Sequence, residues 1–170
     1  MNWVNVIKEG LPEYAKDTKL NLDAVLLRST LDPVIAQGCA LAAAFAAGNS
    51  KLATAIDAEF EDRKEADAAL TAASIMASTN VWYSYTKMIN DSSMTGLGAG
   101  LRMNGIASHG GTSKVNFEAY ALCASIVGKC HDCVVSHYNT LKKEGITVEQ
   151  LRDIGRIAAV INSVSKLLSN

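Results

Sequence analysis

The sequence predicts an all-α protein, and three observations lead to that prediction. Alanine, leucine and charged residues, which favour helices, dominate the chain. No Asn-Gly turn lies between two alternating β-branched runs, as a hairpin would require. Hydrophobic residues make up 49% of the 170 residues and charged residues 19%, so the chain can bury a core without disulfides or metals. We therefore expect a single all-helical domain over residues 1–170.

Two proline signals mark helix starts in the first fifty residues. Residues 11–16 (Leu-Pro-Glu-Tyr-Ala-Lys) predict a short helix with proline in its first turn, and Asp32-Pro33 predicts a cap followed by proline at the first helical position. A small-residue helix is then expected to run to Gly48-Asn49, with Ser50 capping the next helix. Because its many alanines permit close packing, the small-residue helix should lie deep in the structure or in a subunit interface.

Residues 66–90 are predicted to be mostly helical, with a candidate break near residues 78–80 and with Trp82, Tyr83 and Tyr85 in the core. The same region shows a weak sequence similarity to a segment nearer the C-terminus. Residues 73–75 (Ala-Ser-Ile) followed by 79–82 parallel residues 124–126 (Ala-Ser-Ile) followed by 130–133. The likeness is too slight to establish a repeat, which would make the chain two related helical halves.

The chain from Asp91 to Gly111 is expected to be irregular, because glycines interrupt it repeatedly. After it, Thr112 or Ser113 is expected to start a helix that reaches about Val127. Residues 147–150 (Thr-Val-Glu-Gln) form a capping-box pattern that opens a C-terminal helix. Apolar residues recur along that helix at roughly helical spacing, which predicts an amphipathic element: Leu151, Ile154, Ala158, Ile161 and Val164.

The most reactive side chains are concentrated in residues 130–137 (Cys-His-Asp-Cys-Val-Val-Ser-His). A proline-free run to Lys143, with a basic last turn before Gly145, predicts a helix on which Cys130, Cys133 and His137 share one face. A CxxC near a helix start can close and reopen a disulfide, because one thiol attacks while the other resolves the mixed disulfide. The helix dipole at that end also favours a thiolate.

Two further side chains complete a predicted proton relay. His137 lies four residues beyond Cys133, so its imidazole can take the thiol proton near neutral pH. Glu118, on the preceding helix, is the best carboxylate to orient and polarise that histidine if the two helices pack as a hairpin. The sequence thus predicts a catalytic relay from Glu118 through His137 to the cysteines.

Zinc is the competing chemical interpretation of the same residues. Cys130, Cys133 and His137, joined by His131 or Glu118, could in principle make a tetrahedral site. A structural zinc site usually draws a second ligand pair from elsewhere in the chain, and none is visible. Redox chemistry is therefore favoured, and no metal is expected.

The remaining reactive residues are expected to lie outside the relay. Asp132 should face solvent, because a carboxylate directed inward would oppose thiolate formation. Cys39 and Cys123 stand among alanines and leucines, so we expect small buried thiols there. His109 lies in the glycine-rich segment without an evident partner in the sequence.

Composition also limits the partners and the location that we expect. A formal net charge of −1 argues against nucleic-acid binding and against a membrane surface, since both call for a basic excess. The longest apolar stretch, residues 39–48, is far shorter than the roughly 20 residues of a bilayer span. Residues 1–5 lack the charged start and apolar run of a secretory signal. We expect a cytoplasmic protein, in which CxxC indicates redox or metal chemistry more than a structural disulfide.

Glu118, Cys130, Cys133 and His137 at this spacing resemble the signature of the alkyl hydroperoxidase D (AhpD) family, in the carboxymuconolactone decarboxylase-like superfamily. Other segments are similar too, so the resemblance covers nearly the whole chain: residues 11–17, 19–22, 100–104 and 116–118. One position departs from the pattern. AhpD proteins commonly carry histidine immediately before the second cysteine, whereas this chain has Asp132 there and His131 one position earlier. His131 and Asp132 are therefore candidate tuning residues.

The resemblance implies an all-helical subunit with two related halves, a homotrimer, and a thiol peroxidase without a bound cofactor. Electrons would come from dihydrolipoyl groups on a lipoylated acyltransferase and pass to the peroxiredoxin AhpC or directly to an organic hydroperoxide. Cys133 would attack the peroxide, Cys130 would donate a proton and close the Cys130–Cys133 disulfide, and Glu118 and His137 would relay protons. Two alternatives stay open: a carboxymuconolactone decarboxylase-type lactone enzyme on the same fold, and a zinc-stabilised interaction module.

Overall fold

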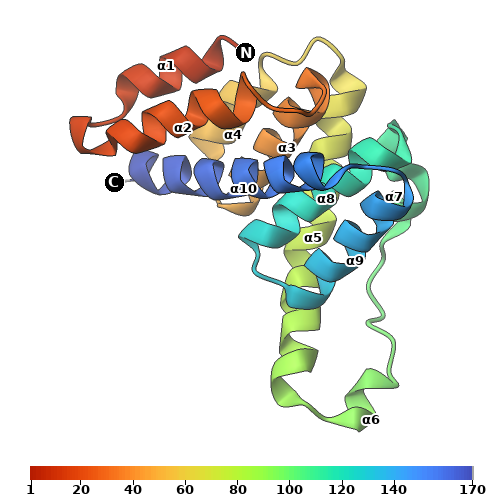
Figure 1. The fold of residues 1–170 in the computed structure, drawn as a ribbon. Coiled ribbons are helices and arrows are strands. Elements are labelled where there is room, and N and C mark those ends of the chain that lie inside the picture. The colour runs from red at the N-terminus through yellow and green to blue at the C-terminus, as the bar shows by residue number, and fades with distance from the viewer. Residues whose placement is uncertain (170) are drawn as a thin grey trace.

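The computed structural model describes residues 1–169, and these form helices joined by short connections, with no β-strand among them (Figure 1). The all-α prediction is confirmed. The described helices, in chain order, are α1 (Trp3–Gly10), η1 (Glu13–Ala15), α2 (Lys16–Leu26), α3 (Pro33–Ala46), α4 (Ser50–Asp57), α5 (Arg63–Ile89), α6 (Ser92–Thr95), α7 (Asn104–Ser108), η2 (His109–Gly111), α8 (Lys114–Val127), α9 (His131–Lys143) and α10 (Val148–Leu168). No helix in this part of the chain is both long and apolar enough to cross a membrane.

Helix α3 lies at the centre of the fold, where α4, α5, α8 and α10 pack against it. Its start follows the sequence prediction: Asp32 accepts a hydrogen bond from the backbone N–H of Val34 (2.8 Å), and Pro33 is the first helical residue. The alanines and Gly38 in its middle are buried, so neighbouring helices approach closely. The alanine-rich segment therefore lies deep inside the subunit.

A polar cluster ties α3, α5 and α8 together. Gly38 of α3 faces the ring of Tyr120 from α8, and a Cβ at this glycine would lie 2.2 Å from the ring. The Tyr120 hydroxyl donates to Glu65 of α5 (2.6 Å), whose other carboxylate oxygen accepts from Asn116 (3.2 Å) and Thr112. Burial, together with the hydrogen bond to Glu65, raises the pKa of Tyr120 well above its usual value. The hydroxyl therefore stays a donor.

Helix α10 closes the core from the C-terminal side. The predicted capping box is present, since Thr147 Oγ1 accepts from the Gln150 N–H (3.2 Å) and Gln150 Oε1 accepts from the Thr147 N–H (3.0 Å). The five apolar positions predicted along this helix are all buried. Asp153 of α10 anchors the segment that precedes α3, because its carboxylate accepts a hydrogen bond from the Thr30 N–H (2.8 Å). The same carboxylate accepts from Arg156, one turn further along α10 (2.9 Å).

Helix α5 is unbroken from Arg63 to Ile89, so the expected break near residues 78–80 is wrong. Ser78 and Thr79 donate their hydroxyls to the Ile75 carbonyl (2.9 and 3.0 Å), which satisfies them inside the helix. The last turns of α5 project beyond the body of the fold together with α6 (Figure 1). Tyr83 and Tyr85 on these turns are 38% and 44% exposed, and Trp82 is only partly buried. The prediction that these three rings enter the core is therefore wrong.

Two helix starts also differ from the sequence prediction. Asn49, not Ser50, caps α4, because its side-chain oxygen accepts from the Leu52 N–H (2.9 Å). The short helix expected over residues 11–16 is a 3-10 turn that continues into α2 as far as Leu26. Residues 91–111 hold only the short α6, α7 and η2 between irregular pieces, in agreement with their glycine content.

Gly38→Ala should destabilise the fold by about 1–3 kcal/mol, the usual cost of forcing atoms into a packed core. The added Cβ would meet the Tyr120 ring. Gly155→Ala in α10 is the matched control, because no neighbouring atom lies within 4 Å of its Cβ position and alanine is favoured over glycine in helices by up to about 1 kcal/mol. Urea unfolding should give shifts of opposite sign. An unchanged unfolding midpoint for Gly38→Ala would contradict the packing argument.

Candidate active site

The candidate site begins where α8 ends and α9 starts. Gly128 closes α8, Lys129 adopts a left-handed backbone conformation (φ 56°), and Cys130 is the N-cap of α9. A side chain at position 128 would clash, since a Cβ there would lie 2.2 Å from the side-chain nitrogen of Asn80. Cys130 Sγ accepts from the backbone N–H of Cys133 (3.3 Å), as a capping side chain does. The CxxC therefore lies at the helix start, as predicted.

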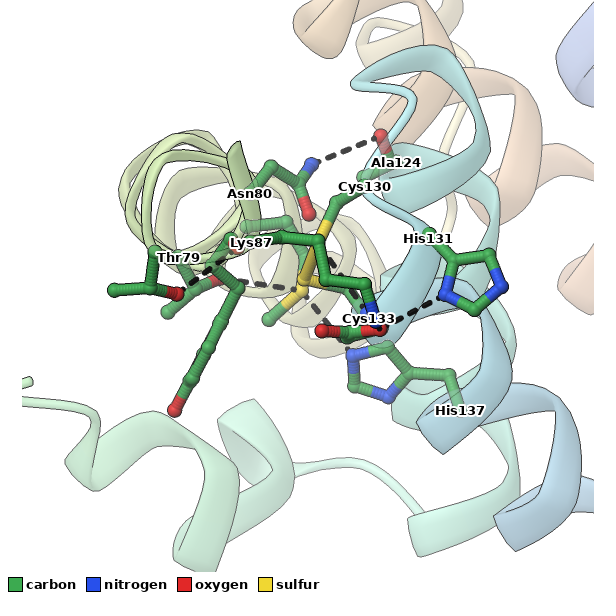
Figure 2. The surroundings of a disulfide bond; sticks show 12 residues. Thr79, Asn80, Lys87, Ala124, Cys130, His131, Cys133 and His137 are labelled. Carbon is green, nitrogen blue, oxygen red and sulfur yellow. Dashed lines mark hydrogen bonds and ion pairs between the residues drawn. A yellow bond between two sulfur atoms is a disulfide. The ribbon is translucent and has the colours of Figure 1, made fainter. Parts of the chain in front are cut away.

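Cys130 and Cys133 form a disulfide (Figure 2), with their Cα atoms 5.3 Å apart. Their exposed fractions are 1% and 6%, so Cys133 is the more open of the two. Both lie at the N-terminal end of α9, where unpaired N–H groups and the positive end of the helix dipole stabilise negative charge. After reduction, this position favours a thiolate.

Glu118 and His137 meet between α8 and α9, as the sequence predicted. His137 Nδ1 lies 2.7 Å from Glu118 Oε2, and both side chains are buried. A carboxylate can only accept, so Nδ1 carries the proton of this bond. Nε2 is then the nitrogen that can exchange a proton with a reacting group. The pair has the arrangement of a base held in place by an acid.

The second nitrogen of His137 has a partner that the sequence analysis missed. Nε2 lies 3.2 Å from Met76 Sδ of α5, and Thr79 Oγ1 lies 3.6 Å from the same sulfur. With the proton on Nδ1, neither Nε2 nor the thioether sulfur has a hydrogen to donate, so this is a packing contact and leaves Nε2 able to take a proton. The helical spacing of Met76, Thr79 and Tyr83 indicated that these residues share one face of α5. Nothing in the sequence showed that this face meets α9.

A cavity of about 290 Å³ opens beside Cys133 and His137. Its other walls come mainly from α5 and from α7 with its N-cap Met103, and most are apolar: Met76, Thr79, Tyr83, Met103 and Ile106. An apolar, partly open cavity of this kind suits a small molecule with an apolar body and one polar reacting end. The glycine-rich region thus contributes a wall of the site, which the sequence did not predict.

The two candidate tuning residues, His131 and Asp132, lie on the outer side of α9. His131 Nδ1 is 2.8 Å from Asp132 Oδ1, and Lys87 Nζ is 3.5 Å from the same oxygen. The hydrogen bond from His131, and after it the charge of Lys87, lowers the pKa of Asp132 below its usual value. Asp132 is exposed, as expected, and borders the cavity mouth. The His131 side chain is 74% exposed and does not join the Glu118–His137 pair.

The other two cysteines are buried away from the site, as predicted. Cys39 donates its thiol to the Ala119 carbonyl (3.6 Å), and Cys123 donates to the Ile154 carbonyl (3.8 Å). Burial raises the pKa of Cys123 well above its usual value, so this thiol stays protonated and unreactive.

The residues weighed as zinc ligands do not form a cluster. Glu118 is engaged by His137, and His131 is engaged by Asp132 on the outer surface. Among residues 1–169, no group of three or more histidine, cysteine, aspartate or glutamate side chains is arranged to hold a metal ion. His109, the remaining histidine, packs its ring 6.1 Å from that of Phe117.

The fold and the site together define a helical dithiol protein, in which a CxxC at a helix start adjoins a buried Glu–His pair. Comparison with known proteins gives the family. Residues 99–169 match the carboxymuconolactone decarboxylase family. The chain is 40% identical to alkyl hydroperoxide reductase AhpD of Mycolicibacterium paratuberculosis, over 97% of this chain and 93% of the relative. It is 39% identical to AhpD of Maricaulis maris (98% and 97% covered) and 41% identical to AhpD of Coxiella burnetii (94% and 93%). The chain belongs to the AhpD family, which confirms the resemblance.

Glu118→Gln should lower the rate at which the reduced protein reacts with a hydroperoxide by about 10- to 1000-fold, in the range of general acid–base contributions. The amide keeps the shape but loses the charge that stabilises a protonated His137. Glu144→Gln is the matched control, because Glu144 makes a surface ion pair with Lys114 (2.7 Å). Stopped-flow measurement of dithiol oxidation checks the prediction. A wild-type rate in well-folded Glu118→Gln would show that the carboxylate takes no part.

Proposed function

We propose that this protein is an alkyl hydroperoxide reductase that uses the Cys130–Cys133 dithiol and receives its electrons from dihydrolipoyl groups. The observation that supports this most strongly is the position of Cys133, at a helix start, beside His137 and on the wall of an apolar cavity. The name of the relatives, alkyl hydroperoxide reductase AhpD, agrees with it. The alkyl part of the substrate would occupy the cavity, with its peroxide group toward Cys133.

The first step oxidises Cys133. Its thiolate attacks the terminal oxygen of the hydroperoxide, the O–O bond breaks, and the sulfur becomes a sulfenic acid. The departing alkoxide takes a proton and leaves as the alcohol. His137, oriented by Glu118, is placed to move that proton, because it lines the same cavity as Cys133.

The second step closes the disulfide, and the third reopens it. Cys130 attacks the sulfenic sulfur, forms the S–S bond and releases water. A dihydrolipoyl group then reduces the disulfide by thiol exchange and becomes the cyclic lipoyl disulfide, so two electrons and two protons pass to the protein. A lipoylated acyltransferase is the proposed carrier of that group. The peroxiredoxin AhpC is the proposed second acceptor, through exchange of its own disulfide with the Cys130–Cys133 dithiol.

We also propose that the subunit assembles as a homotrimer. The alanine-rich helix α3, which suggested an interface, is buried inside the subunit. The support for a trimer therefore comes from a different surface. Large apolar side chains are exposed on the projecting end of α5 and in the segment after it: Val81, Tyr83, Tyr85, Met88, Ile89, Leu97 and Leu101. A surface of this kind is typical of a contact between subunits.

Purified protein supplied with dihydrolipoamide and cumene hydroperoxide should form lipoamide and alcohol in equal amounts. Replacing both buried thiols, with Cys39→Ala and Cys123→Ala, should leave the rate within about threefold, since neither lies at the site. Cys133→Ser should abolish turnover. A carboxymuconolactone decarboxylase-type activity, the competing function, needs no CxxC. Lactone turnover that survives Cys133→Ser, without hydroperoxide reduction by the unsubstituted protein, would replace the proposal.

The two cysteines should have unequal roles. Cys133 shares its helical face with His137 and opens on the cavity, so peroxide should oxidise it first. In Cys130→Ser, peroxide should leave a sulfenic acid on Cys133 that dimedone traps. In Cys133→Ser, Cys130 should stay largely reduced, as mass spectrometry of the trapped protein would show. A sulfenic acid on Cys130 formed at the wild-type rate would reverse the assignment.

A further inference from the structure

The side chain of Asn80, from the middle of α5, fits against the connection that carries Cys130. Its amide nitrogen donates to the Ala124 carbonyl in the last turn of α8 (3.4 Å), and it is only 5% exposed. The same nitrogen lies where a Cβ at Gly128 would be, at 2.2 Å. Asn80 is thus enclosed between α5 and the start of the CxxC segment, as Figure 2 shows.

The amide oxygen of Asn80 has no hydrogen-bond partner among residues 1–169. Its orientation follows from chemistry, since the Ala124 carbonyl is an acceptor and can only be met by the amide nitrogen. The oxygen therefore points to the other side, toward the disulfide in Figure 2. An unpaired polar atom in a buried position costs free energy and calls for an explanation.

The other side-chain donors drawn near Asn80 in Figure 2 are engaged with other groups. Thr79 Oγ1 gives its one hydrogen to the Ile75 carbonyl, and Lys87 lies at the surface, 65% exposed, where it pairs with Asp132. Ser125 Oγ, which is also buried and unpaired in the described chain, makes no hydrogen bond to it. Cys130 carries no hydrogen while its sulfur is in the disulfide. Reduction changes this, because the Cys130 thiol then has an S–H to donate.

We propose that Asn80 is a positioning residue whose side-chain oxygen accepts a hydrogen bond from the Cys130 thiol in the dithiol form of the protein only. The bond favours the dithiol over the disulfide, since only the dithiol satisfies the buried oxygen. It also favours the neutral thiol at Cys130, against the Cys133 N–H that the same sulfur accepts, because an amide oxygen stabilises S–H and repels a thiolate. Cys133, beside His137, is then the thiol that ionises first.

The exchange with dihydrolipoamide tests this directly. Protein disulfide and dihydrolipoamide give protein dithiol and lipoamide, with two electrons and two protons transferred, and alkylation with mass detection measures the ratio at equilibrium. Asn80→Leu keeps the branched shape without the oxygen. We expect its equilibrium constant to move about tenfold toward the disulfide, which is about 30 mV lower in potential for a two-electron couple.

Asn80→Asp is the second variant, because it keeps a side-chain oxygen and removes the nitrogen that meets Ala124. Its equilibrium constant with dihydrolipoamide should stay within about threefold of that of the unsubstituted protein, or move toward the dithiol. Asn49→Ala is the control for loss of a buried amide elsewhere, since Asn49 holds the Ser165 carbonyl (2.8 Å), and it should not change the equilibrium. If Asn80→Leu does not fold, Asn80→Ala replaces it with the same expected direction.

Three results would overturn the inference: an unchanged equilibrium in folded Asn80→Leu or Asn80→Ala, an equal shift in Asn80→Leu and Asn80→Asp, or the same shift in Asn49→Ala. The inference rests on the redox role proposed above, but its readout needs no peroxide. A shifted equilibrium without hydroperoxide reduction would remove the proposed function and keep the role of Asn80. Normal hydroperoxide reduction with an unshifted equilibrium in the Asn80 variants would keep the proposed function and remove the role of Asn80.

Discussion

The buried hydrogen bond between Glu118 and His137 is the interaction on which the site depends. Removing a carboxylate from water costs at least several kcal/mol unless it is paired, so α8 can carry Glu118 inward only where α9 supplies a partner. His137 meets it at 2.7 Å. This pairing fixes how α9 lies on α8, and the connection between the two helices must then be short. Gly128 and the left-handed Lys129 make that turn, and Cys130 becomes the cap of α9 as a result.

The small-residue core determines what stands opposite this pair. Gly38 and the alanines of α3 allow α5 and α8 to approach closely, and Glu65 on α5 holds Tyr120 and Asn116 of α8. The middle of α5 is therefore brought against α9, where Met76 meets His137 and Asn80 meets the end of α8. Beyond that point α5 leaves the body of the fold, so its final turns expose their aromatic side chains (Figure 1).

The two sulfurs of one CxxC thus lie in different surroundings. Cys133 borders the apolar cavity together with His137, whereas Cys130 is enclosed at the turn between α8 and α9. A thiol beside a base and a cavity can ionise and meet a substrate. An enclosed thiol near an amide oxygen is better suited to remain protonated until a sulfenic acid forms next to it. The proposed roles, with Cys133 attacking the peroxide and Cys130 closing the disulfide, follow from these surroundings, because the two thiols are chemically alike.

The sequence by itself determined the helical class, the capping of α10 and the four residues proposed for the relay, because these rest on local rules; for α3 it left a place in the core or in a subunit interface open. Caps involve residues within one turn, and helical spacing places Cys133 and His137 on one face whatever surrounds them. Even the Glu118–His137 pair joins consecutive helices. The tertiary structure alone decided that α5 completes the site and that its aromatic end stays outside the core. Met76 and His137 are 61 positions apart, and their contact depends on how α3, α5 and α8 pack, which no local pattern encodes.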